Sequence, residues 1–276
     1  MSADFEELAG GMRHPEGVAW NPFDGRIYAG GECGEIYALT LDGAVEEIGS
    51  TGGSMLGLAV DGRGRVYACD AGKGEVVRLD PVTGSFEVYA PGPLDTPNML
   101  CFDDAGNLYV TCSGEGDPSS AIVARVAPGC EPEIWTRALP RYPNGCCLSP
   151  SGDALVVVES RLPGVRRVPI RPDGSAGAPE VLSTLPDTEP DGIALDDDGN
   201  LYVTLYRPDG ILRIGVDGTV EVVVADPLAH TFDAPTNLAF VGPTLERVVV
   251  ANVGDTFLAI GDVGARGLPL RYPEVP

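Results

Sequence analysis

The sequence predicts an all-β fold, a six-bladed β-propeller with four strands in each blade. Three observations predict it: a motif recurs six times, each copy contains short apolar runs separated by turns, and the first residues supply a strand that the last copy lacks. Repeats of about 40 to 50 residues that contain several strands are typical of propeller blades. We expect one domain over residues 1–276.

The six repeats align at one residue that precedes the first apolar run of each copy. These residues are Glu16, Leu56, Asn98, Asn144, Asp191 and Thr236, with spacings of 40, 42, 46, 47 and 45 residues. After each comes an apolar run, a turn rich in Asp, Gly and Asn, and a second apolar run, which together indicate a β-hairpin. A third and a fourth run follow, as at residues 35–39 and 45–48 in the first copy, and they complete four strands.

The two ends of the chain are expected to form one blade together. The sixth repeat has a third run at residues 257–260 but no fourth run after it. Residues 5–9, with the sequence FEELA, resemble the fourth runs of the first two repeats at 45–48 and 86–89. We therefore expect residues 5–9 to form the outer strand of the last blade and to cover an otherwise exposed strand edge.

Composition argues against several classes of partner and location. The net charge of −23 repels phosphate backbones and anionic lipids, so we expect neither nucleic-acid nor membrane binding. No apolar stretch is long enough to span a bilayer, and the acidic residues among 1–10 are unlike a signal peptide. The seven cysteines include no CxxC pair, which favours a reduced, cytoplasmic protein. A closed propeller needs no partner subunit, so we expect a monomer.

Four polar side chains are predicted to meet at the mouth of the central channel. In a propeller the first strand of each blade lines the channel, so the aligned residues lie at its rim. Glu16, Asn98, Asn144 and Asp191 then converge from four blades. Carboxylate and amide oxygens suit Ca²⁺, Mg²⁺ or Mn²⁺. With only two histidines a His-rich zinc site is excluded, although zinc in an oxygen site is not. The alternative is a polar channel that holds only water.

Several segments resemble one known family, that of the gluconolactonases and senescence-marker proteins (regucalcins), which includes the luciferin-regenerating enzymes. These segments are residues 14–20 (HPEGVAW), 142–145 (YPNG), 149–152 (SPSG), 190–195 (PDGIAL), 198–202 (DGNLY) and 235–240 (PTNLAF). The resemblance covers essentially the whole chain, blade by blade. It implies a six-bladed propeller with one divalent metal ion.

The resemblance also implies roles for the rim residues. Glu16, Asn144 and Asp191 would bind the metal ion, with Ca²⁺ expected first and Zn²⁺, Mg²⁺ or Mn²⁺ as alternatives. Asn98 would orient the substrate or a water molecule. The implied reaction is hydrolysis of a small-molecule lactone or ester, and we expect Asp191 to act as the general base.

Two departures from the family pattern concern the substrate. Sugar-lactonases often carry Arg where this chain has Thr96, and Leu56 makes one side of the rim apolar. The substrate is therefore either a sugar-acid lactone or a less polar lactone. Tyr142 beside a rim position, and Glu115 in the loop at residues 113–120, are further candidates for substrate contact. That loop is either a lid over the channel or a solvated surface loop.

Two other functional classes stay open on the sequence. The same metal site suits a propeller phosphotriesterase or another enzyme of secondary metabolism. The third class is a non-enzymatic metal-binding or scaffold propeller.

Overall fold

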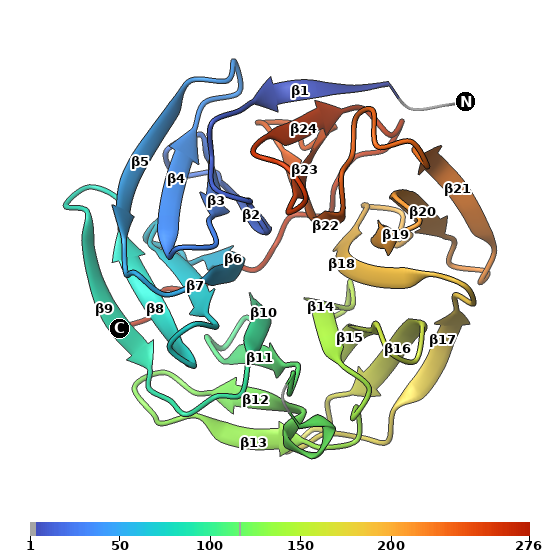
Figure 1. Cartoon of the computed structure of the whole chain (residues 1–276). Helices are drawn as coiled ribbons and strands as arrows, with labels where there is room; N and C mark the ends of the chain where they lie inside the picture. The colour runs from blue at the N-terminus through green and yellow to red at the C-terminus, as the bar shows by residue number, and fades with distance from the viewer. Residues whose placement is uncertain (1–3, 116) are drawn as a thin grey trace.

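The computed structural model describes residues 4–115 and 117–276 and shows six four-stranded antiparallel sheets arranged as a ring (Figure 1). The sheets stand around a central axis like the blades of a propeller. Neighbouring blades contact one another through their innermost strands, and the ring closes between β2 and β22. The predicted six-bladed propeller is confirmed.

Each blade contributes one strand to each of four concentric layers. The inner strands are β2 (Gly17–Asn21), β6 (Met55–Val60), β10 (Pro97–Phe102), β14 (Pro143–Leu148), β18 (Glu189–Leu195) and β22 (Pro235–Val241). The second strands are β3 (Arg26–Gly30), β7 (Val66–Asp70), β11 (Leu108–Cys112), β15 (Ala154–Glu159), β19 (Leu201–Arg207) and β23 (Arg247–Asn252). The third strands are β4 (Glu35–Leu39), β8 (Glu75–Asp80), β12 (Ile122–Val126), β16 (Gly164–Pro169), β20 (Gly210–Ile214) and β24 (Leu258–Gly261). The outer strands are β5 (Val45–Ser50), β9 (Ser85–Ala90), β13 (Glu133–Thr136), β17 (Glu180–Thr184), β21 (Val220–Ala225) and, from the N-terminus, β1 (Phe5–Ala9).

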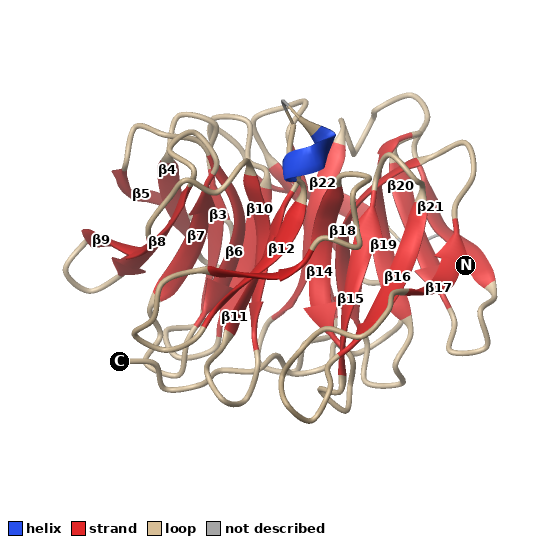
Figure 2. Ribbon diagram, turned by 90° about the horizontal axis from the view of Figure 1, so that it is seen from below, coloured by secondary structure: helices blue, strands red, loops and turns tan. Residues whose placement is uncertain are grey.

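The last blade is built from both ends of the chain. Strand β1 pairs antiparallel with β24, with Phe5 opposite Gly261 and Glu7 opposite Ala259. The prediction for residues 5–9 is confirmed, and the pairing covers the outer edge of β24 as expected. One short 3-10 helix, η1 (Pro118–Ser120), lies on the face opposite the C-terminus (Figure 2). No helix among the described residues is long and apolar enough to cross a membrane.

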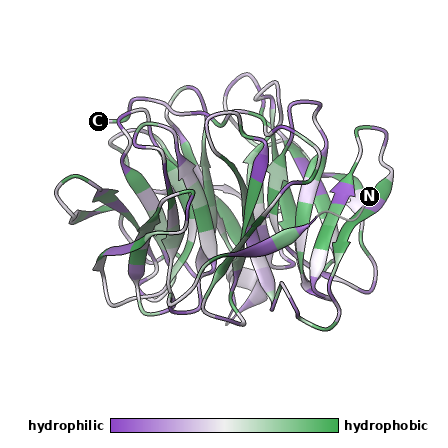
Figure 3. Ribbon diagram, turned by 90° about the horizontal axis from the view of Figure 1, so that it is seen from above, coloured by the Kyte–Doolittle hydropathy of each residue, from purple (hydrophilic) through white to green (hydrophobic). Residues whose placement is uncertain are grey.

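The core is divided into layers between adjacent blades. Hydrophobic segments concentrate in the strands (Figure 3), and six clusters of buried side chains each join neighbouring sheets. Tyrosines of the second strands, including Tyr28 and Tyr67, are fully buried. Their hydroxyl groups donate to turn carboxylates, as from Tyr28 to Asp24 at 2.6 Å and from Tyr67 to Asp61 at 3.0 Å. The repeated aromatic residue therefore packs the core and also holds the adjacent turn.

Glycines permit the inner strands to approach one another near the axis. In four blades the residue after the rim residue is Gly17, Gly57, Gly145 or Gly192. A Cβ atom on Gly17 would lie 1.9 Å from the carbonyl oxygen of Leu56, and one on Gly145 would lie 2.5 Å from that of Asp191. These distances are too short for any side chain, so the glycines set how tightly the ring closes.

The C-terminal segment, for which no role was predicted, crosses the face of the ring opposite η1. We call residues 262–276 the C-terminal strap. The amide of Leu268 donates to the carbonyl of Leu195 at 2.9 Å, Arg271 donates to the carbonyl of Pro150 at 2.8 Å, and the amide of Gly62 donates to the carbonyl of Pro273 at 2.8 Å. The strap thus contacts blades five, four and two in turn and ends beside β9 (Figure 1).

Gly17→Ala tests the close approach of the inner strands. We expect it to lower the free energy of unfolding by about 1–3 kcal/mol, because backbone must shift to relieve the clash. Urea unfolding followed by circular dichroism measures this. Gly49→Ala is the matched control, since its Cβ would meet only the side chain of Phe86, at 3.0 Å. Equal unfolding midpoints for the two variants would show that the rim glycines do not limit closure.

Candidate functional site

The six aligned rim residues lie together at one mouth of the channel, but their backbone differs from the prediction. Only Glu16 lies just before its inner strand. In the other five blades the residue lies inside the strand, at a β-bulge where two residues oppose one on the second strand. A bulge re-aims a side chain relative to a regular ladder. Asn98, Asn144 and Asp191 therefore owe their direction to these bulges.

A strained residue precedes four of the rim residues by two positions. His14, Thr96, Tyr142 and Ala234 have φ values of 41°, 55°, 66° and 51°. This left-handed conformation is costly for residues other than Gly, and each of the four also precedes a proline, which restricts it further. Such strain persists only where the surrounding structure holds the backbone firmly. The backbone of the rim is consequently held firmly. In these four blades the strained residue lies two positions before the rim residue.

Two threonines connect the bulges of one blade to the rim of the next. The Thr111 hydroxyl accepts from the amide of Met99 at 3.0 Å and donates to the carbonyl of Asn144 at 2.7 Å. The Thr204 hydroxyl makes the same pair of bonds, from the amide of Gly192 at 2.8 Å and to the carbonyl of Thr236 at 2.7 Å. Neither threonine was among the residues predicted for the site. Their signal was present, since each ends an identical LYVT segment, at residues 108–111 and 201–204.

Further hydroxyl groups continue this chain around the rim. The Ser160 hydroxyl accepts from the Asn144 amide group at 3.1 Å and donates to the carbonyl of Pro190 at 2.6 Å. The Thr236 hydroxyl donates to the carbonyl of Glu16 at 2.8 Å. Blades three, four, five, six and one are thereby linked in order. Among the described residues no such hydroxyl bond reaches Leu56, the rim residue of blade two.

The two rim carboxylates are half-buried and lack a cationic partner. Burial, followed by the charge of Glu115, raises the pKa of Glu16 to about 7. Burial and then the charge of Glu16 raise the pKa of Asp191 well above its ordinary value, against a hydrogen bond from Asn144 that lowers it. None of the ion pairs in residues 4–115 and 117–276 involves Glu16 or Asp191. The rim therefore holds negative charge that an added cation would stabilise.

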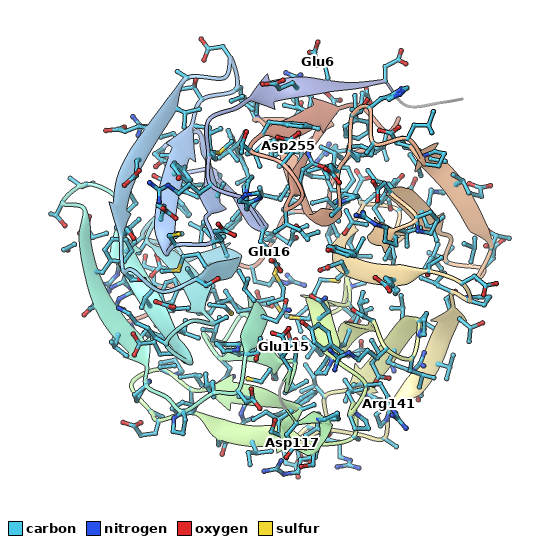
Figure 4. The ribbon with its side chains drawn as sticks, in the orientation of Figure 1. Glu6, Glu16, Glu115, Asp117, Arg141 and Asp255 are labelled. Atoms are coloured by element: carbon cyan, nitrogen blue, oxygen red, sulfur yellow. The ribbon has the colours of Figure 1, made fainter. Side chains whose placement is uncertain are left out.

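Glu115 and Tyr142 extend the polar surface of the rim. Glu115 is exposed and lies with Glu16 on the channel side of the ring (Figure 4). Burial and the charges of Glu115, Glu16 and Asp191 raise the pKa of the Tyr142 phenol. The guanidinium of Arg161 lies 4.4 Å from the centre of the same ring, a cation–π contact.

The other predicted substrate residues differ in what they offer. Asn98 is buried, and in the described part of the chain no hydrogen bond uses its side-chain amide, which leaves that group for a ligand. The Thr96 hydroxyl instead donates to Asp95 at 3.1 Å. Leu56 is half-buried and packs with a core cluster between blades two and three. The rim is thus polar on most blades and apolar on blade two.

The donor set fits a hard divalent cation. Glu16 and Asp191 supply two half-buried acidic groups, and the Asn144 amide is held by Ser160 through its nitrogen, so its oxygen is the group left to face a ligand. Within residues 4–115 and 117–276 no group of three His, Cys, Asp or Glu side chains forms a metal site. Oxygen-rich sites completed by amides and water are nevertheless usual for Ca²⁺.

Comparison with known proteins identifies a family for this chain. Residues 96–253 match the family described as the SMP-30/Gluconolactonase/LRE-like region. That match covers more than half of the chain. The chain belongs to the SMP-30/gluconolactonase/LRE-like family.

Individual relatives of this SMP-30/gluconolactonase/LRE-like protein are distant. Regucalcin of Sus scrofa is 32% identical over 92 residues, which is 32% of this chain and 31% of the relative, so the alignment spans less than a third of that protein. A gluconolactonase structure from Xanthomonas campestris superposes with a TM-score of 0.81 at 22% identity, covering 94% of this chain and 89% of that one. A regucalcin from Agrobacterium tumefaciens, described as calcium-binding, superposes with a TM-score of 0.81 at 19% identity, covering 97% and 99%. At these identities the superpositions show the shared fold.

The uncompensated carboxylates predict how stability depends on pH without metal. Because the pKa of Glu16 rises from 4.5 to about 7 on folding, its stabilising contribution is complete below about pH 4.5 and is lost as the pH rises through 7. In EDTA, from about pH 5 to about pH 8, we expect the free energy of unfolding to fall further for the wild type than for Glu16→Gln, by at most about 3 kcal/mol. Urea unfolding across this range measures it. The exposed Glu131→Gln variant serves as the control, and superimposable pH profiles for all three proteins would contradict the assignment.

Proposed function

We propose that this protein is a divalent-metal-dependent hydrolase that opens a lactone ring. One observation carries the proposal: the convergence of Glu16, Asn144 and Asp191 at the channel mouth, with two half-buried carboxylates and no cationic partner among the described residues. A site of this kind is costly for the folded protein unless it binds a cation. Membership of the SMP-30/gluconolactonase/LRE-like family supports lactone hydrolysis as the reaction.

Glu16, Asn144 and Asp191 would hold the metal ion, for which Ca²⁺ is the first candidate and Zn²⁺, Mg²⁺ and Mn²⁺ are the alternatives. A divalent cation bound here would polarise the lactone carbonyl and favour deprotonation of water. The two acidic ligands would nearly neutralise its charge.

The protein residues then have separate tasks in ring opening. Asp191 takes a proton as the oxygen atom of water attacks the carbonyl carbon. The bond between this carbon and the ring oxygen breaks, the ring oxygen gains a proton, and the product is a hydroxy acid. The free amide of Asn98 orients the substrate or the attacking water. Tyr142 and Glu115 contact the substrate above the rim.

The variant Asp191→Ala tests the catalytic assignment. We expect its kcat/KM for lactone hydrolysis to fall by on the order of a thousandfold, because a general base and a metal ligand are removed together. Hydrolysis is followed by the acid released into a weakly buffered pH-indicator solution. Asp198→Ala, at an exposed position, is the matched control and should keep the wild-type rate. Near-normal hydrolysis by folded Asp191→Ala would overturn the assignment.

Metal removal tests the cofactor and the reaction class. Treatment with EDTA should abolish hydrolysis of every lactone in a panel of aldonolactones and alkyl lactones, and one of Ca²⁺, Mg²⁺, Mn²⁺ or Zn²⁺ should restore it. Isothermal titration calorimetry gives the metal affinity independently. Metal binding without turnover of any lactone, but with turnover of a phosphotriester, would favour the alternative chemistry at the same site. Absence of metal binding would favour a scaffold propeller.

A further inference from the structure

The channel is hollow directly below the rim. A cavity of about 100 Å³ lies there, lined by the inner strands of all six blades and closed at the opposite end by residues 268–272 of the C-terminal strap. Its upper end is formed by Met99, whose chain neighbour Asn98 is a rim residue. The cavity and the candidate site are therefore adjacent parts of one channel.

The cavity exists because every inner strand carries a small side chain at the same level. The third residue after each rim residue lines the cavity and is Ala or Cys in all six blades: Ala19, Ala59, Cys101, Cys147, Ala194 and Ala239. The residues one position further along are large in most blades, including Trp20, Phe102 and Phe240. The small side chains leave room at their level, and the larger residues that follow them also line the cavity.

The lining is chemically suited to hydrocarbon. It consists mainly of aliphatic, aromatic and sulfur-containing side chains, and Trp20 and Tyr272 each carry one polar group on an aromatic ring. The two remaining polar side chains have partners: the Ser149 hydroxyl donates to Asp153 at 2.8 Å, and Arg271 donates to the carbonyl of Pro150 at 2.8 Å. Water needs two to four polar partners to occupy a cavity, whereas apolar cavities stay dry and accept apolar molecules.

The rim is apolar on the side of blade two. Leu56 of blade two is the rim residue that the chain of hydroxyl bonds does not reach, and the next residue, Gly57, leaves room for the thioether of Met99, which would lie 2.5 Å from a Cβ there. The Asn237 side-chain amide reaches across the channel from the opposite blade and donates to the Met99 sulfur atom at 3.3 Å. Thioether sulfur is a weak acceptor on a flexible side chain. The contact between Asn237 and Met99 therefore closes the channel only weakly, and an entering alkyl chain could displace it.

We infer that the cavity receives the aliphatic chain of the substrate, which enters between Leu56 and Met99 while the lactone ring stays at the rim. The substrate class is then lactones that carry an alkyl side chain, in preference to polyhydroxylated sugar lactones. This inference rests on the proposed function. The proposed metal ligands come from blades one, four and five, so the side of blades two and three carries none of them.

A homologous series of γ-lactones with side chains from methyl to octyl tests the inference, with an aldonolactone beside it. The value of kcat/KM should rise by on the order of fourfold for each added methylene until the cavity is full. It should then level off or fall, and the aldonolactone should be a poorer substrate than the longer alkyl lactones. A rate independent of chain length, or a clear preference for the aldonolactone, would overturn the inference while leaving the lactonase proposal intact.

Filling the cavity provides the matched variants. Ala59→Leu and Ala239→Leu add bulk at the level of small residues, and each should flatten the dependence of kcat/KM on chain length. Ala44→Leu adds the same bulk at an exposed position and should keep the wild-type dependence. Thermal unfolding identifies any variant that does not fold. If one of the two cavity variants fails to fold, the kinetics of the other test the inference. An unchanged chain-length dependence in a folded cavity variant would overturn the inference.

A binding experiment on the wild-type protein needs no catalysis. Cys101 lines the cavity and is partly accessible, whereas Cys130 is exposed on the surface. In the presence of the divalent cation, 4-hydroxydecanoate should slow alkylation of Cys101 by iodoacetamide several-fold, and 4-hydroxybutanoate should not. Neither should affect Cys130, as followed by peptide mass spectrometry. If no lactone is hydrolysed, the proposed function fails, and this protection alone supports or overturns the cavity assignment.

Discussion

The close approach of six inner strands around one axis is the constraint on which the rest of this structure depends. Glycines after the rim residues make it sterically feasible, because a Cβ atom at Gly17 or Gly145 would collide with the backbone of the next blade. The same approach brings the rim carbonyl groups of one blade within hydrogen-bonding distance of hydroxyl groups on the preceding blade. The close approach of the inner strands therefore determines both the packing at the axis and the position of the candidate site. Outer layers add core area but do not set this geometry.

The site concentrates charge that the fold alone does not stabilise. Burial and the charge of Glu115 raise the pKa of Glu16, and burial and the charge of Glu16 raise that of Asp191. Glu16 follows the strained His14 by two positions, whereas Asp191 lies in a β-bulge. A protein that needed only a polar channel would not require so firm a frame around two acids. The proposed binding of a cation would account for both the rigid frame and the unmatched charge.

Departures from sixfold symmetry make the channel polar on some blades and apolar on others. The hydroxyl bonds run through five blades and leave out blade two, where Leu56 replaces a polar rim residue. On blades three and six the position after the rim residue is Met99 and Asn237 instead of Gly, and these two side chains meet across the axis. Below them, six small residues leave a hollow that the strap closes. An asymmetric rim above an apolar cavity offers distinct environments for the polar and apolar parts of one ligand.

The sequence by itself determined the number of blades, the four strands in each, the closure by residues 5–9 and the identity of the rim residues. These features follow from local periodicity and from repetition, which need no knowledge of three-dimensional packing. Only the tertiary structure decided that five rim residues lie in β-bulges, that Thr111 and Thr204 hold the rim of the next blade, that Thr96 turns to Asp95, and that the strap closes a cavity. Each of these depends on which residues of different blades come into contact. Such contacts arise from the closure of the ring, a property of the whole chain that no single repeat encodes.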